Sequence, residues 1–139
     1  GLTSYAHPMS CAAALATIEV MLEDGLIERS AALGVRMQER FDRMTERFAC
    51  IGEARAKGLY GVIELVQGEG TRSPLVPEGA SGAEAAPTAA LRAALRTLGV
   101  HMAVKGPRAF IAPPLMIPES VLMEGLDRFE EALSIGIPE

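Results

Sequence analysis

Histidine and cysteine often act as nucleophiles, bases or metal ligands, and here they are few and scattered. The sequence has two histidines, His7 and His101, and two cysteines, Cys11 and Cys50. Neither histidine lies in a local Ser-His-Asp or Cys-His signature. Neither cysteine lies in a CxxC motif or at zinc-ligand spacing from a histidine. We therefore predict no metal site, structural or surface histidines, and two small buried thiols in a reducing cytoplasm.

A lysine forms a Schiff base readily only where a desolvated pocket keeps its amine neutral. The two lysines, Lys57 and Lys105, each precede a glycine in a predicted turn, where a lysine is solvated. The sequence also lacks a glycine-rich phosphate motif, because Gly68-Glu69-Gly70 is too short to match one. The residues by themselves therefore indicate no catalytic set.

Arginines recur at helical spacing between residues 36 and 47, and acidic residues lie between them. This pattern predicts a solvated face of mixed charge rather than a phosphate-binding one. The formal net charge is −5, aromatic residues make up 4% of the chain and tryptophan is absent, so we predict no nucleic-acid partner. The arginines are Arg36, Arg40, Arg43 and Arg47, and the acidic residues are Glu39, Asp42 and Glu46.

The chain has 139 residues, of which 49% are hydrophobic and 22% are charged. This composition is typical of one soluble globular domain. No apolar run approaches the ~18–20 residues that span a membrane, and the first residues lack the features of a signal peptide. Because the sequence begins with Gly1 rather than Met, we expect a piece of a longer or processed chain.

Two helices are predicted at the start of the chain. Residues 9–23 are apolar nearly all round, so we predict that this helix is buried between two protein bodies. Residues 26–48 form an amphipathic helix whose polar face is rich in Glu and Arg. Its apolar face consists of Leu26, Ile27, Leu33, Met37, Phe41, Met44 and Phe48.

After Cys50 the apolar pattern changes to that of short strands. Residues 51–58 and 59–66 predict a hairpin that turns at Lys57-Gly58. Gly61, inside the second strand, predicts a bulge or a close backbone approach.

The second half of the chain begins with a loop at 67–87 that is too long for a plain connector. Such loops are usually functional, disordered or packed against another body. The next helix is expected to have Thr88 as its N-cap and to stop at Gly99. The remaining elements are this helix at 88–98, strands at 100–104 and 109–112, and a helix at 117–134.

This order of elements predicts an α+β fold. Because consecutive strands are joined by tight turns, the sheet should be small and largely antiparallel, with three or four strands and helices covering one side. Either the other face of the sheet or the apolar first helix needs a cover from outside the chain.

Four segments, in this order along the chain, resemble the class III, fold-type I pyridoxal-phosphate (PLP) aminotransferases. GLTSYAHPMSCAAA is similar to a Gly-Thr-His-Pro stretch of that family, and GEARAKGLYGVIELV is similar to its hairpin. TRSPLVP resembles a segment of the taurine–pyruvate and other omega-amino acid:pyruvate branches, and APPLMI resembles a strand end before the final helix. These segments are residues 1–14, 52–66, 71–77 and 112–117.

The resemblance implies that the chain is the C-terminal part of a longer protein. Residues 1–25 would be an interdomain segment with the buried apolar helix, and residues 26–139 the small C-terminal domain. In that family the Schiff-base lysine belongs to the large domain, which would lie upstream of Gly1, so no catalytic residue is expected here. We expect a cytoplasmic homodimer with its active sites at the subunit interface.

The resemblance also implies two binding roles. Thr3 matches the threonine whose hydroxyl and backbone N–H bind the PLP phosphate in the partner's site, and such groups suit a dianion. Many omega-aminotransferases carry a carboxylate-binding arginine in the strand after the third helix, but here that position is Ala103. Arg108 is then the candidate for the substrate carboxylate, with an exposed turn arginine as the alternative. Glu64 is expected to stabilise the hairpin.

The expected activity of the intact protein is transfer of an amino group from an amine or omega-amino acid to a 2-oxo acid such as pyruvate. The isolated chain is expected to be inactive, because it lacks the Schiff-base lysine. One alternative is another PLP enzyme of the same superfamily, namely an aminomutase, a decarboxylase or a racemase. A second alternative is a free-standing α+β binding or dimerisation module.

Overall fold

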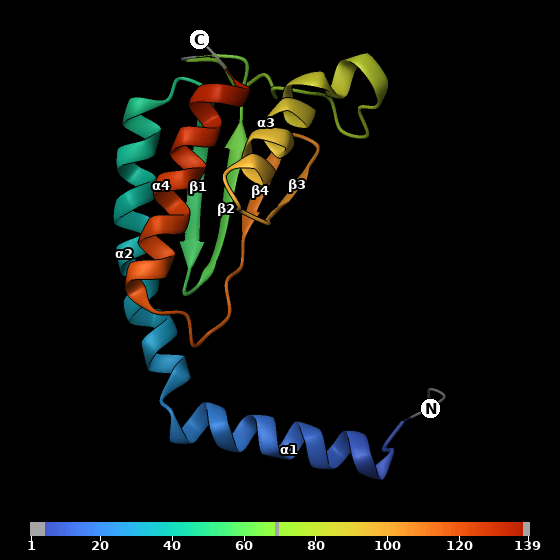
Figure 1. Ribbon diagram of the computed structural model, residues 1–139, viewed down its shortest axis with the longest axis vertical. Coiled ribbons are helices and arrows are strands. Elements are labelled where there is room, and N and C mark those ends of the chain that lie inside the picture. Colours follow the sequence, from blue (N-terminus) through green and yellow to red (C-terminus); the bar gives the residue numbers. More distant parts are fainter. Residues whose placement is uncertain (1–4, 69, 138–139) are drawn as a thin grey trace.

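The computed structural model describes residues 5–68 and 70–137. Three helices pack on one face of a small sheet, and the first helix projects from one end of this body (Figure 1). The helices are α1 (Pro8–Glu23), α2 (Leu26–Arg47), α3 (Ala86–Thr97) and α4 (Glu119–Gly136), and the strands are β1 (Ile51–Lys57), β2 (Tyr60–Leu65), β3 (Ala103–Lys105) and β4 (Arg108–Ile111).

The four strands form one antiparallel sheet in the spatial order β1-β2-β4-β3. The β1–β2 hairpin turns at Gly58, whose φ of +56° favours glycine. At the centre of the sheet, Ile63 of β2 pairs with Ala109 of β4. The predicted α+β fold, with a largely antiparallel sheet covered by helices on one side, is confirmed.

The core lies between the sheet and the helices. Ile63 and Ala109 are fully buried on the helix-covered face of the sheet. Phe41 of α2 and Leu133 of α4 are also fully buried in this core. The apolar spacing predicted for α2 is confirmed except at Ile27, which is 54% exposed because it lies off the buried stripe.

Gly61 marks a close approach of β2 to α2. A Cβ atom at this position would lie 2.7 Å from Cζ of Phe41. The one register shift between β1 and β2 lies elsewhere, between Ile51 and Glu53. Of the two predictions for Gly61, the close approach is therefore correct and the bulge is wrong.

Helix side chains bond to the backbone of both outer strands. The amide of Gln38 in α2 accepts a hydrogen bond from Ala56 N–H (2.7 Å) and donates one to Ala54 C=O (3.2 Å) in β1. The Arg92 guanidinium in α3 donates to Val104 C=O in β3 (3.2 Å). These bonds satisfy backbone groups that an edge strand otherwise offers to a second chain.

The helix predicted at 88–98 begins two residues earlier, at Ala86. The N-cap prediction is wrong because Pro87 fits the first helical turn, where its missing N–H costs nothing. Thr88 is buried and donates its hydroxyl to Ala85 C=O. Gly99 ends the helix as predicted: its φ is +73°, and Val100 N–H bonds back to Leu95 C=O (2.8 Å).

Helix α1 has no buried residue in this structure. The helix begins one residue before the predicted range, with His7 at the N-cap and Pro8 in the first turn. Cys11 is exposed, so the prediction of a buried thiol does not hold within this chain, because no described element covers α1. Within the described residues, no helix has the length and apolarity to cross a membrane.

Candidate functional site

The face of the sheet opposite the helices carries the candidate substrate-binding residue. Side chains alternate along a strand, so Arg108 and Phe110 project away from the core side where Ala109 lies. Cross-strand pairing then places two rows of side chains side by side on this open face, a charged row through Arg108 and an apolar row through Phe110.

In the charged row, Arg108 pairs with Glu64 of β2 and Lys105 of β3. The Arg108 guanidinium forms an ion pair with Glu78, which belongs to the long loop at 67–87. Arg108 lies in β4 rather than in the turn, and one of its guanidinium nitrogens, Nη2, is paired with the Glu78 carboxylate. Thirty residues separate the two partners, and no sequence signal indicated Glu78.

Glu64 pairs with Arg55 across the hairpin, at 3.0 Å between Oε1 and Nη2. This confirms its expected role in stabilising the hairpin. Glu64 is thus paired with Arg55, and the carboxylate that neutralises Arg108 is that of Glu78.

In the apolar row, Phe110 pairs with Val62 on one side and with Ala103 on the other. Ala103 is exposed at the start of the outer strand β3. Arg55 of β1 lies beside Val62 at the far end of this row, where its guanidinium is paired with Glu53 and Glu64.

Thr3 lies outside the described residues, so the structure carries no observation on its phosphate-binding role. His101 is exposed just before β3, and Lys57 and Lys105 are exposed at the ends of β1 and β3, as expected for solvated turn residues. In the ranges 5–68 and 70–137, no group of three His, Cys, Asp or Glu side chains is placed to hold a metal ion.

The predicted mixed-charge face of α2 is confirmed: Arg36, Arg43 and Arg47 are exposed, and Arg40 alone of the four arginines is partly buried. Glu130 of α4 is only 10% exposed at its side chain and accepts from Arg40 (2.5 Å) and Arg47 (2.7 Å). Arg36 reaches Glu119 at the start of α4 (3.3 Å). Three of its arginines thus also form ion pairs with α4, which sequence spacing on α2 alone could not reveal.

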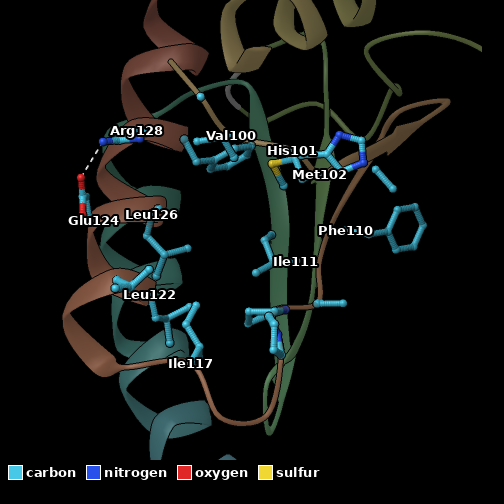
Figure 2. A pocket seen from close by; sticks show the side chains of 18 residues that line it. Val100, His101, Met102, Phe110, Ile111, Ile117, Leu122, Glu124, Leu126 and Arg128 are labelled. Carbon is cyan, nitrogen blue, oxygen red and sulfur yellow. Dashed lines mark hydrogen bonds and ion pairs between the residues drawn. The ribbon is translucent and has the colours of Figure 1, made fainter. Parts of the chain in front are cut away.

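A hollow of about 590 Å³ opens between α4 and the ends of β3 and β4. Leu122 and Leu126 of α4 face Ile111 across it, and Ile117 lies at its lower end (Figure 2). Phe110, in contrast, points away from the gap toward the open face. The lining is mostly apolar, with an ion pair between Glu124 and Arg128 (2.6 Å) at one side.

The family model "Aminotransferase class-III" matches residues 1–133 of this chain. The chain belongs to the class-III aminotransferases. Enzymes of this class use PLP, which confirms the resemblance seen in the four sequence segments.

Two relatives and one solved structure illustrate the similarity. Isoleucine 2-epimerase of Lentilactobacillus buchneri is 33% identical over 132 residues, which are 95% of this chain and 28% of the epimerase. A probable 4-aminobutyrate aminotransferase of Bacillus subtilis is 34% identical over 133 residues, 96% of this chain and 29% of that protein. The structure is taurine:2-oxoglutarate aminotransferase of Bifidobacterium kashiwanohense, in complex with PLP and glutamate. Its TM-score is 0.86 at 28% identity, over 96% of this chain and 29% of that one.

This class-III chain therefore spans less than a third of the length of the relatives it matches. The matched part has the same fold as part of a PLP-containing transaminase.

Proposed function

We propose that the intact polypeptide is a PLP-dependent transaminase. It would transfer an amino group from an amine or omega-amino acid to a 2-oxo acid such as pyruvate. The observation that carries this proposal is the class-III match over residues 1–133, joined with the fold similarity to a taurine aminotransferase.

In this proposal residues 26–139 form the small C-terminal domain, and residues 1–25 form the interdomain segment. The exposed large apolar side chains support this division, because most of them lie on α1 or at the end of the body next to it. Monomeric proteins rarely leave such patches uncovered. The missing cover would be the large domain, in a cytoplasmic homodimer whose active sites lie at the subunit interface.

When bound, PLP supplies the electron sink for chemistry at the amine carbon, and the protein supplies orientation and electrostatics. The Schiff-base lysine would come from the large domain. In this chain, Thr3 would bind the PLP phosphate of the partner's site through its hydroxyl and backbone N–H. Thr3→Val in the full-length enzyme should therefore raise the Kd for PLP, whereas Thr3→Ser should preserve binding.

Arg108 would bind the carboxylate of the 2-oxo acid with its bidentate fork. Because Glu78 holds the guanidinium in this structure, the substrate carboxylate would have to replace Glu78. Arg108→Gln should then raise KM for the 2-oxo acid and leave KM for the amine unchanged. Arg72→Gln, on the same loop as Glu78 and exposed, is the matched control.

The decisive experiment is absorption spectroscopy on the full-length protein. Bound PLP should give a visible band that an amine donor bleaches and pyruvate restores. A protein that shows no band with PLP is not a transaminase. Reading the gene upstream of Gly1 for a lysine-bearing large domain separates the enzyme from a free-standing module.

A racemase or epimerase is the second candidate, because the isoleucine 2-epimerase is as similar to this chain as the aminotransferases are. The apolar row through Phe110 also suits an amino acid with an apolar side chain. Chiral chromatography distinguishes the two reactions. A racemase inverts L-isoleucine or L-leucine with no 2-oxo acid present, whereas a transaminase needs the acceptor.

A further inference from the structure

The apolar row on the open face of the sheet crosses three strands. Val62, Phe110 and Ala103 occupy neighbouring positions on β2, β4 and β3. Neighbouring strands lie about 4.8 Å apart, so the row is about 10 Å wide. Phe110 is half-buried, and its ring points away from the gap beside α4 toward the open side (Figure 2). The row is therefore an apolar surface as wide as the side chain of a small ligand, and the charged row runs beside it.

Glu78 marks the place at which the charged row receives a carboxylate. It is paired with Arg108, and a Cβ atom on Gly106 would lie 3.2 Å from its Oε2, so its carboxylate lies against the turn between β3 and β4. Lys105 lies opposite Arg108 on β3 and brings a second cation to the same place. The Glu78 side chain is 62% exposed. A ligand carboxylate can therefore take this position when Glu78 leaves it.

The apolar row lies one side-chain spacing from this carboxylate position. Arg108 and Phe110 are two residues apart on β4, which separates them by about 6.6 Å. The chain of a branched aliphatic 2-oxo acid extends about 5 Å from its carboxylate carbon, so its end reaches Phe110. A second carboxylate at that point would lose its hydration without a free cation to bind it. The guanidinium of Arg55, at the far end of the row, is already paired with Glu53 and Glu64 (3.0 Å each).

We propose that Phe110 is a specificity-determining residue that binds the aliphatic side chain of the amino-group acceptor. This rests on the proposed function, in which the acceptor carboxylate replaces Glu78 at Arg108. The substrate class is a 2-oxo monocarboxylic acid with a branched aliphatic side chain, such as 4-methyl-2-oxopentanoate. The oxo acid becomes the corresponding amino acid while the amine donor becomes its carbonyl compound, so the reaction needs no further reagent.

Equilibrium binding to the full-length protein tests this subsite without catalysis. The probes are 4-methylpentanoate and propanoate, which lack the oxo group and cannot accept an amino group, and calorimetry gives both Kd values. We expect 4-methylpentanoate to bind about tenfold or more tightly, because its additional carbons lie on the apolar row. Phe110→Ser should remove most of this difference, and Phe110→Leu should keep it. Equal Kd values for the two acids, or no binding of either acid, would overturn the proposal.

The matched control is Tyr60→Ser, which removes an aromatic side chain, 53% exposed, from the same face of β2 near the hairpin turn. This variant should leave the ratio of the two Kd values unchanged. In steady-state kinetics, Phe110→Ser should lower the ratio of kcat/KM for 4-methyl-2-oxopentanoate to that for pyruvate by about tenfold, through KM. If Tyr60→Ser and Phe110→Ser change these ratios equally, Phe110 does not determine specificity.

The two readouts separate this inference from the proposed function. A protein that shows no PLP band but binds 4-methylpentanoate through Phe110 refutes the transaminase assignment and retains the subsite. An active transaminase with equal Kd values for the two acids retains the assignment and refutes the subsite.

Discussion

Single residues determine how closely the helices and the sheet pack. At Gly61 the backbone of β2 lies so near the ring of Phe41 that no side chain fits between them. The ring itself is fully buried and cannot move into solvent. The absence of one Cβ atom therefore sets the distance between α2 and the sheet.

Gly61→Ala should destabilise the protein by about 1–3 kcal/mol, because the new methyl group overpacks the contact with Phe41. Gly68→Ala is the control, since a Cβ atom there meets nothing within 4 Å. Urea denaturation of both variants measures the difference. Equal unfolding free energies would show that Phe41 is not the obstacle.

Glu130 has a comparable role among the charged residues. Its carboxylate, only 10% exposed, accepts from arginines at two positions of α2. Glu130→Gln should cost about 1–2 kcal/mol, because Arg40 loses the more buried of its two charge partners and keeps only the exposed Asp127. The cost stays below that of a fully buried pair, since the second arginine, Arg47, is 67% exposed.

The control for Glu130 is Glu124→Gln, which removes an exposed i,i+4 pair with Arg128 and should cost no more than about 0.5 kcal/mol. Thermal unfolding at low and high salt compares the two. If Glu124→Gln is as costly as Glu130→Gln, burial does not strengthen the ion pairs between α2 and α4.

At the scale of the elements, a helix side chain bonds to the backbone of each edge strand of the sheet. In β1, Ala56 N–H donates to the Gln38 amide and Ala54 C=O accepts from it, and in β3 Val104 C=O accepts from Arg92. The helices thus contribute polar bonds to the strands in addition to apolar cover. This arrangement limits edge-to-edge pairing between copies of the sheet.

Gln38→Met should lower the unfolding free energy by about 1–2 kcal/mol, because Ala56 N–H loses its acceptor. It should also increase aggregation, since the outer edge of β1 becomes available for pairing. Gln67→Met, an exposed residue after β2, controls for added surface apolarity. Denaturant titration and light scattering measure the two effects, and similar values for both variants would contradict the edge-closing role.

At the scale of the whole molecule, the distribution of apolar surface is uneven. Helix α1 exposes apolar side chains on all sides, whereas the body between the sheet and the other helices is well packed. A helix of this composition is stable in water only when other protein surfaces cover it. The isolated chain should therefore be prone to self-association.

In the full-length protein, Leu15→Gln and Ile18→Gln should each cost about 1.5–3 kcal/mol if α1 is buried there. Both side chains are more than half exposed in this chain. Ile135→Gln, equally exposed but near the far end of α4, should stay within about 0.5 kcal/mol of the parent. Three equal values would contradict the burial of α1.

The sequence by itself determined the order of the elements, the antiparallel sheet and the family. These follow from local signals: the apolar period along α2, glycine at Gly58 and Gly99, and contiguous motifs. The sequence also indicated that α1 needs cover from outside the chain, because this need follows from the apolar composition of the helix alone.

Only the tertiary structure decided which distant residues meet. Glu78 with Arg108, Glu130 with two arginines of α2, and the hollow beside α4 join positions between 30 and 90 residues apart, or residues of several elements. Side-chain partners across such separations are set by how the layers pack, and no local pattern encodes them. The fold places the long loop against the sheet, so that Glu78 pairs with Arg108. A substrate carboxylate that binds Arg108 would therefore have to replace Glu78.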